Sequence, residues 1–258
     1  MSYPVHVTRE LQIQGSLQNG SRGADVRKVQ EWFTIHRFAT SVYGDFGDAT
    51  ERAVRDFQRS RRLPESGKVT ASTWSALVEP LHKALQPVVL GAGATLSTAV
   101  LKVARQHLAQ HPIEVGGQNR GPWVRVYMGG NQGEDWLWCA GFVTFMLRQV
   151  SQLLGQPMPL PGSYSCDSLA YQAKERSLFV AGREVGNGQG WNHLGSAQIF
   201  LVRKTATDWT HTGLSFAGEG NVFRTMEGNS NGNGSRNGFE ACSLTRTVAK
   251  KDFIRLSA

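Results

Sequence analysis

The first part of the chain alternates polar stretches with apolar positions at the three- and four-residue spacing of one helix face. Such segments begin at Asp25, Asp48 and Thr70, residue types that favour a helix start. Each predicted helix is too short to be stable alone, so we expect the three to bury their apolar faces together. The expected core positions are Val26, Val29, Trp32, Phe33, Ala53, Val54, Phe57, Trp74 and Leu77.

A segment without helical periodicity follows this helical region. Pro87, Gly91 and Gly93 interrupt any helix there, which predicts a linker. The expected organisation is an N-terminal tail over 1–14, a helical domain over 15–80, a linker over 81–95 and a second domain over 96–258.

The second domain begins with another helical pattern and continues into mixed structure. Apolar spacing predicts a helix from Leu96 that ends before Pro112, and residues 119–135 are typical of a loop with aromatic anchors. From Trp136 the chain is apolar on nearly every helical face, which predicts a buried central helix with Cys139 at its start. Gly and Asn are concentrated further on, as in turn-rich β structure. The predicted fold class is therefore α+β.

Two alternating runs between residues 211 and 229 predict a β-hairpin. A turn centred on Glu219 would place His211 directly opposite Glu227, on the same face of the sheet. A shift of the turn by one residue would instead place His211 opposite Asn229. In both registers a histidine meets a group that can hold its ring.

Cys139 at a helix N-terminus is a candidate nucleophile, because the helix dipole favours thiolate over thiol. A free cysteine is also a common small core residue, and a single histidine on a strand is commonly a surface residue. Glu227 could likewise be an exposed strand charge, and Asn229 a turn former. Taken together, however, Cys139, His211 and Glu227 or Asn229 make a cysteine nucleophile with its base and orienting group the favoured interpretation.

The composition indicates what kind of partner the protein binds and where it is made. Lys and Arg outnumber Asp and Glu by 28 to 20 in 258 residues, a net charge of +8, which favours an anionic partner such as nucleic acid, a membrane surface or a cell wall. No nucleic-acid-binding motif is present. No apolar run reaches the roughly 20 residues of a spanning helix, and no signal peptide is recognised, so we expect synthesis in the cytoplasm without membrane insertion. Three cysteines exclude a disulfide framework but allow one bridge and one free thiol. Cys166 and Cys242 have no predicted role, and whether they pair is left open.

The N-terminal helical region resembles the three-helix type of peptidoglycan-binding domain. The resemblance lies in GSRGADVRKVQEWF and YGDFGDATERAVRDFQRSRRLPESGKVTASTW, where the motif pieces of that family occur in order and with the right gaps from Gly20 to Leu77. It implies binding to bacterial peptidoglycan.

The second domain resembles the CHAP family of papain-like cysteine amidases and endopeptidases. The matching pieces are GGQNRGPWVRVYM, WCAGFV, HTGLSF and TMEGNSNGNGSRNG, in family order. The resemblance implies a papain-like domain with a central helix on an antiparallel sheet. It makes Cys139 the nucleophile, His211 the base and later the acid, and Glu227 the group that orients His211, with Asn229 supporting or replacing it. Thr212 stands where a small apolar residue commonly follows the histidine.

These observations predict a peptidoglycan hydrolase that cuts a stem-peptide or muramoyl amide bond, with no cofactor and no metal. The pair His107 and His111 has metal-ligand spacing, but Pro112 follows at once and no zinc motif is present. The alternatives are a wall-binding protein without activity and a transglutaminase-like acyl transferase. The expected partner is peptidoglycan, with anionic wall or outer-surface polymers as further partners. The protein is expected to be a phage endolysin that reaches the wall after holin-type release, or an antibacterial effector delivered by a secretion system.

Overall fold

The computed structural model describes residues 3–38, 40–185, 190–234 and 237–256. By its contacts the chain divides into two compact units, one formed by residues 1–83 and 113–134 and the other by residues 84–112 and 135–258. In order along the chain, the described helices are α1 (Val5–Leu11), α2 (Ala24–Ile35), α3 (Asp48–Ser60), α4 (Ala71–Leu77), α5 (Glu79–Leu85), α6 (Leu96–Leu108), α7 (Pro122–Tyr127), α8 (Cys139–Leu154), α9 (Cys166–Glu175), α10 (Gly182–Val185) and the 3-10 helix η1 (Gly190–His193). None of the described helices is long and apolar enough to cross a membrane.

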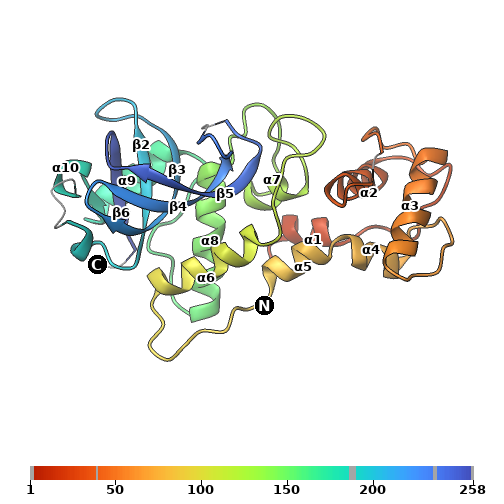
Figure 1. The fold of residues 1–258 in the computed structure, drawn as a ribbon, viewed down its shortest axis with the longest axis horizontal. Coiled ribbons are helices and arrows are strands. Elements are labelled where there is room, and N and C mark those ends of the chain that lie inside the picture. The colour runs from red at the N-terminus through yellow and green to blue at the C-terminus, as the bar shows by residue number, and fades with distance from the viewer. Residues whose placement is uncertain (1–2, 39, 186–189, 235–236, 257–258) are drawn as a thin grey trace. The chain divides into compact units, whose positions relative to one another are not determined.

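The described strands form one antiparallel sheet in the second unit. They are β1 (Phe179–Val180), β2 (Ala197–Arg203), β3 (Trp209–Glu219), β4 (Val222–Ser230), β5 (Glu240–Thr247) and β6 (Lys251–Arg255), paired in the order β1-β6-β2-β3-β4-β5. Helix α8 packs against β3 and β4, and α6 packs against α8 (Figure 1). The predicted α+β class is confirmed: a helical N-terminal region precedes an antiparallel sheet with helices.

The core of the first unit is the one that the apolar pattern predicts. All nine expected core positions on α2, α3 and α4 are buried. Thr70 caps α4, since its side chain accepts a hydrogen bond from the Thr73 N–H. The buried amides of Gln30 and Gln58 bind backbone groups of the neighbouring loops, which fixes the connections between these helices.

The structure contains helices that the sequence did not predict, among them α5 at the start of the expected linker over 81–95, α9, and the two short helices α1 and α7. Residues 5–11 of the expected tail form α1, and the expected loop over 119–135 contains α7, which begins with Pro122 at its first turn. Both helices are too short to show a helical period in the sequence. Helix α7 has nearly all its side chains buried and packs on α1 and α2, with Trp123 edge-on to Trp32 at 6.0 Å between ring centroids.

A buried arginine joins these helices within the first unit. Arg125 on α7 contacts Glu10 on α1 through two hydrogen bonds of 2.8 Å, and its Nη2 lies 2.6 Å from Oε2 of Glu31 on α2. The two glutamate side chains are 7% and 3% exposed. The carboxylates would repel each other without the cation between them. Residues 113–134 belong to the first unit, which this contact helps to hold together. The sequence predicted them as part of the domain over 96–258.

We expect Arg125→Met to lower the free energy of unfolding by about 3–5 kcal/mol, because it leaves two buried carboxylates without a counter-ion. Urea unfolding of the intact chain measures this. Arg22→Met is the matched control, since it removes an ion pair with Asp45 that is exposed and worth at most about 1 kcal/mol. Equal losses in both variants would contradict the importance of the buried contact.

Candidate functional site

The candidate site lies within the second unit, where α8, α9 and three strands meet. Cys139 is the first residue of α8, as predicted, and is 3% exposed. His211 on β3 and Glu227 on β4 are buried. His211 Nε2 lies 2.8 Å from Glu227 Oε2, and the thiol of Cys139 interacts with the same imidazole. The structure thus brings together Cys139, His211 and Glu227.

The hairpin register differs from the first expectation, although the predicted contact is present. Leu214 pairs with Met226 and Phe216 with Arg224, which is the register shifted by one residue. The turn is asymmetric because the pairing is irregular between Phe216 and Glu219. In this register Glu227 is a diagonal neighbour of His211, and long side chains can span that separation.

Gly213 lies between these two side chains and leaves the space for their contact. A Cβ atom built on Gly213 would lie 2.9 Å from Glu227 Cγ and 2.8 Å from Phe200 Cε1. Because real Cβ atoms do not approach so closely, a larger residue would have to displace the carboxylate. The glycine therefore permits the diagonal hydrogen bond to His211.

The side chain of Asn229 hydrogen-bonds Trp138 and Gly238, whereas His211 hydrogen-bonds Glu227. Asn229 has a left-handed backbone conformation with φ of 51°, at an irregularity in the pairing of β4 with β5. In the amide orientation that pairs donors with acceptors, its side chain accepts from the Trp138 N–H at 3.2 Å and donates to the Gly238 carbonyl at 2.6 Å. Trp138 directly precedes Cys139, so Asn229 ties the start of α8 to the sheet. Residues 235 and 236 of the Gly- and Asn-rich run lie outside the described residues.

Arg246 is a site residue that the sequence did not indicate. From β5 it donates to both carboxylate oxygens of Glu227, with distances of 2.6 Å from Nε and from Nη2. Thr225 also donates to Glu227. Burial alone would raise the pKa of Glu227, but Arg246 and His211 outweigh it and lower that pKa to about 2. Glu227 is therefore a permanent anion at neutral pH.

The neighbouring thiol of Cys166 is the second unforeseen member of the site. The sulfur atoms of Cys139 and Cys166 are 3.9 Å apart. The hydrogen bond with Cys166 lowers the pKa of Cys139 well below its usual value despite burial, and His211 and the Thr212 N–H act in the same direction. The sequence did not predict that Cys166 lies beside Cys139. The sequence offered one weak indication: a serine, a common N-cap residue, directly precedes Cys166, and in the structure Ser165 caps the helix that Cys166 begins.

The imidazole of His211 favours its protonated form. Burial would lower its pKa, but the interactions with Cys139 and Glu227 outweigh burial and raise it to about 9. Nδ1 of the ring is buried and makes no hydrogen bond of ordinary geometry with the described residues. A thiolate beside an imidazolium combines a nucleophile with a proton donor, which suits acyl transfer.

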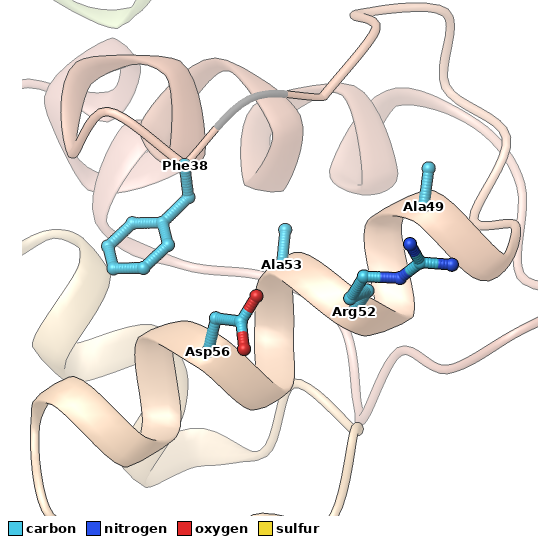
Figure 2. Close-up of a pocket in the computed structure, with 5 residues that line it drawn as sticks. All are labelled: Phe38, Ala49, Arg52, Ala53 and Asp56. Carbon is cyan, nitrogen blue, oxygen red and sulfur yellow. The ribbon is translucent and has the colours of Figure 1, made fainter.

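A pocket of about 260 Å³ lies on the helical part of the first unit (Figure 2). It is lined by Phe38, Ala49, Arg52, Ala53 and Asp56, mostly from α3. The ring of Phe38 is fixed edge-on against Phe33 and Phe57. The pocket combines an aromatic ring with one cation and one anion, a lining suited to a polar ligand with an apolar face.

Among the described residues, no group of three or more His, Cys, Asp and Glu side chains could hold a metal ion. His107 is buried and binds the Gln149 carboxamide at 2.8 Å. Burial lowers its pKa to about 4. It is therefore a neutral core residue.

Residues 22–77 match the family described as putative peptidoglycan binding domain. The chain thus carries an N-terminal module of the peptidoglycan-binding type, which supports association with the cell wall. A search of curated proteins finds no match.

Three solved structures share short similar regions. The SleB N-terminal domain is 35% identical, with 25% of this chain and 89% of that chain covered and a TM-score of 0.24. A fused Zn-dependent amidase/peptidase/peptidoglycan-binding domain-containing protein from Clostridium acetobutylicum ATCC 824 is 32% identical, with 25% and 29% covered and a TM-score of 0.24. The Burkholderia AP3 phage endolysin is 21% identical, with 40% of each chain covered and a TM-score of 0.25. This chain spans less than half of the last two proteins.

We expect Gly213→Ala to lower the free energy of unfolding by about 1–3 kcal/mol, because the added methyl group displaces Glu227 or Phe200. The weakened contact with Glu227 should also lower the pKa of His211 from about 9, as measured by NMR titration. Gly232→Ala is the control, since nothing lies within 4 Å of a Cβ built there. Identical unfolding and titration of the two variants would show that Gly213 is not needed for the contact.

Proposed function

We propose that this protein is a peptidoglycan hydrolase that cleaves an amide bond with Cys139 as its nucleophile. The observation that carries the proposal is the chain of contacts from the Cys139 thiol through His211 to the buried Glu227 carboxylate. The likeness of the second domain to CHAP amidases and endopeptidases, and the peptidoglycan-binding match over residues 22–77, support the choice of substrate.

Attack on the amide requires a thiolate and a way to hold the resulting oxyanion. The low pKa of Cys139 supplies the thiolate at neutral pH. Cys139 begins a helix of 16 residues, so its own backbone N–H points out of the helix start. That N–H is suited to donate to the oxyanion of the tetrahedral intermediate.

His211 would transfer protons in both halves of the reaction. Since Glu227 holds Nε2, Nδ1 is the nitrogen that remains to exchange a proton. The imidazolium donates this proton to the leaving amine nitrogen, and an acyl-enzyme forms on the Cys139 sulfur. The neutral ring then takes a proton from water, which attacks the acyl group and regenerates the thiolate.

Glu227 and Arg246 would hold the ring rather than react. The carboxylate fixes the orientation of His211 and stabilises its positive charge. Arg246 keeps the carboxylate ionised in its buried position. Asn229 would act one step further away, by holding Trp138 at the start of α8.

The N-terminal module would bind the wall and raise the concentration of substrate around the second unit. The pocket lined by Phe38, Arg52 and Asp56 is our candidate for a contact with the wall polymer. The net charge of +8 favours anionic wall or outer-surface polymers as additional partners. A phage endolysin and a secreted antibacterial effector both fit this chemistry.

We expect Cys139→Ala to lower the release of fragments from purified peptidoglycan by at least about a thousandfold, because the nucleophile is lost. Mass spectrometry of the products measures this and distinguishes free stem peptides, the products of an amidase, from uncrosslinked muropeptides, the products of an endopeptidase. Cys242→Ala is the matched control and should digest the wall normally. If neither the natural protein nor C139A releases fragments but both sediment with the wall, the protein is a binder without activity.

The proposed ion pair makes activity fall as the pH rises. Because the reactive state needs a protonated His211, whose pKa is raised to about 9, the rate should be constant through neutral pH and fall as the pH rises through about 9. Glu227→Gln removes an anion that raises this pKa, so the fall should begin at lower pH. The measurement is the pH profile of kcat/KM on a soluble muropeptide. An unchanged alkaline limb in E227Q would mean that another group controls it.

A further inference from the structure

Cys139, the proposed nucleophile, lies beside a second thiol, that of Cys166. The sulfur atoms of Cys139 and Cys166 are 3.9 Å apart, and both residues are buried, at 3% and 8% exposure. Each cysteine is the first residue of its helix, Cys139 of α8 and Cys166 of α9. Both are free thiols. In amide hydrolysis Cys166 only lowers the pKa of Cys139 through their hydrogen bond and forms no bond to the substrate, so a second thiol beside the nucleophile calls for an explanation.

The fold holds Cys166 in this position through contacts on both sides of it. Ser165 caps α9 by accepting from the Ser168 N–H. Asp167, the next residue, accepts a hydrogen bond of 2.6 Å from the backbone N–H of Trp209 on β3. His211 is two residues further along that strand. The start of α9 is thus tied to the strand that carries the imidazole, and the approach of the two sulfurs is built into the second unit.

The two thiols differ in their chemistry. The pKa of Cys139 is lowered by Cys166 and His211, whereas the hydrogen bond with Cys139, burial and the charge of Asp167 raise the pKa of Cys166 well above its usual value. One sulfur is therefore an anion that attacks an oxidant, and the other is a thiol that keeps its proton. A disulfide bond has a length of about 2 Å, so the sulfurs must approach by roughly 2 Å more.

We propose that Cys139 and Cys166 are an oxidation site: a peroxide converts them into an intramolecular disulfide that reversibly switches off the nucleophile. The site itself is defined by the sulfur geometry, while its effect on wall digestion rests on the proposed function.

The reaction consumes one hydrogen peroxide for each disulfide. The Cys139 thiolate attacks one peroxide oxygen, the O–O bond breaks, and the hydroxide that leaves takes up a proton to become water. Cys139 is thereby oxidised to sulfenic acid. The Cys166 sulfur then attacks the Cys139 sulfur, the S–O bond breaks, and hydroxide leaves as water with the proton of Cys166. Two thiols have lost two electrons and two protons, and the peroxide has been reduced to two water molecules.

The experiment treats the purified full chain with hydrogen peroxide and measures two quantities. Peptide mass spectrometry maps any cross-link, which lowers the mass by about 2 Da. Digestion of peptidoglycan is measured before treatment, after treatment and after addition of dithiothreitol. The variants are Cys166→Ser, which removes the second thiol, and Cys242→Ser, the control that removes the half-buried thiol on β5.

For the natural protein and C242S we expect a cross-link between residues 139 and 166, loss of digestion, and full recovery with dithiothreitol. C166S should lose activity without recovery, because its sulfenic acid is oxidised further to the irreversible sulfinic acid. The proposal is overturned if the natural protein shows no such cross-link, or if C166S recovers as well as the natural protein. A reduced protein that forms the cross-link but never digests the wall would refute the proposed function alone.

Discussion

The charge of the buried Glu227 carboxylate is the constraint on which the site depends. A carboxylate without solvent is costly unless cations and donors surround it, and here His211 and Arg246 both do so. The three residues come from adjacent strands, β3, β4 and β5. Pairing of the sheet therefore assembles the charges, and the charges in turn favour the correct pairing. The raised pKa of His211 follows from this arrangement. The pKa of Cys139 is lowered first by its hydrogen bond with Cys166 and then by His211.

Much of the fold follows from local patterns in the sequence. The helices that begin near Asp25, Asp48 and Leu96 have clear apolar faces, and their starts are correct to within one residue of the prediction. Helices α1 and α7 could not be predicted in this way. Their few residues are held by distant partners such as the pair of Arg125 with Glu10, which no local pattern contains.

In the candidate site too, the features that neighbouring residues determine could be predicted, and those that depend on distant contacts could not. The position of Cys139 at a helix start and the existence of the hairpin are local properties. The register is not, because an irregularity after Phe216 moved it by one residue from the symmetric expectation. The contact of His211 with Glu227 is nevertheless present, since Gly213 leaves a diagonal path. Arg246 and Cys166 were missed because the sequence does not show which strand pairs with β4 or where α9 packs.

The way in which the chain divides between the two units has a consequence for the evolution of such proteins. Residues 113–134 belong to the first unit although residues 84–112, which precede them, belong to the second. Recombination at the segment around Pro87 would therefore separate Arg125 from Glu10 and Glu31, and both products would lose these ion pairs. Exchange of the first unit between relatives, by nature or by engineering, would have to transfer α7 together with the first 83 residues. The first unit is compact in the structure but consists of two separate segments of the sequence.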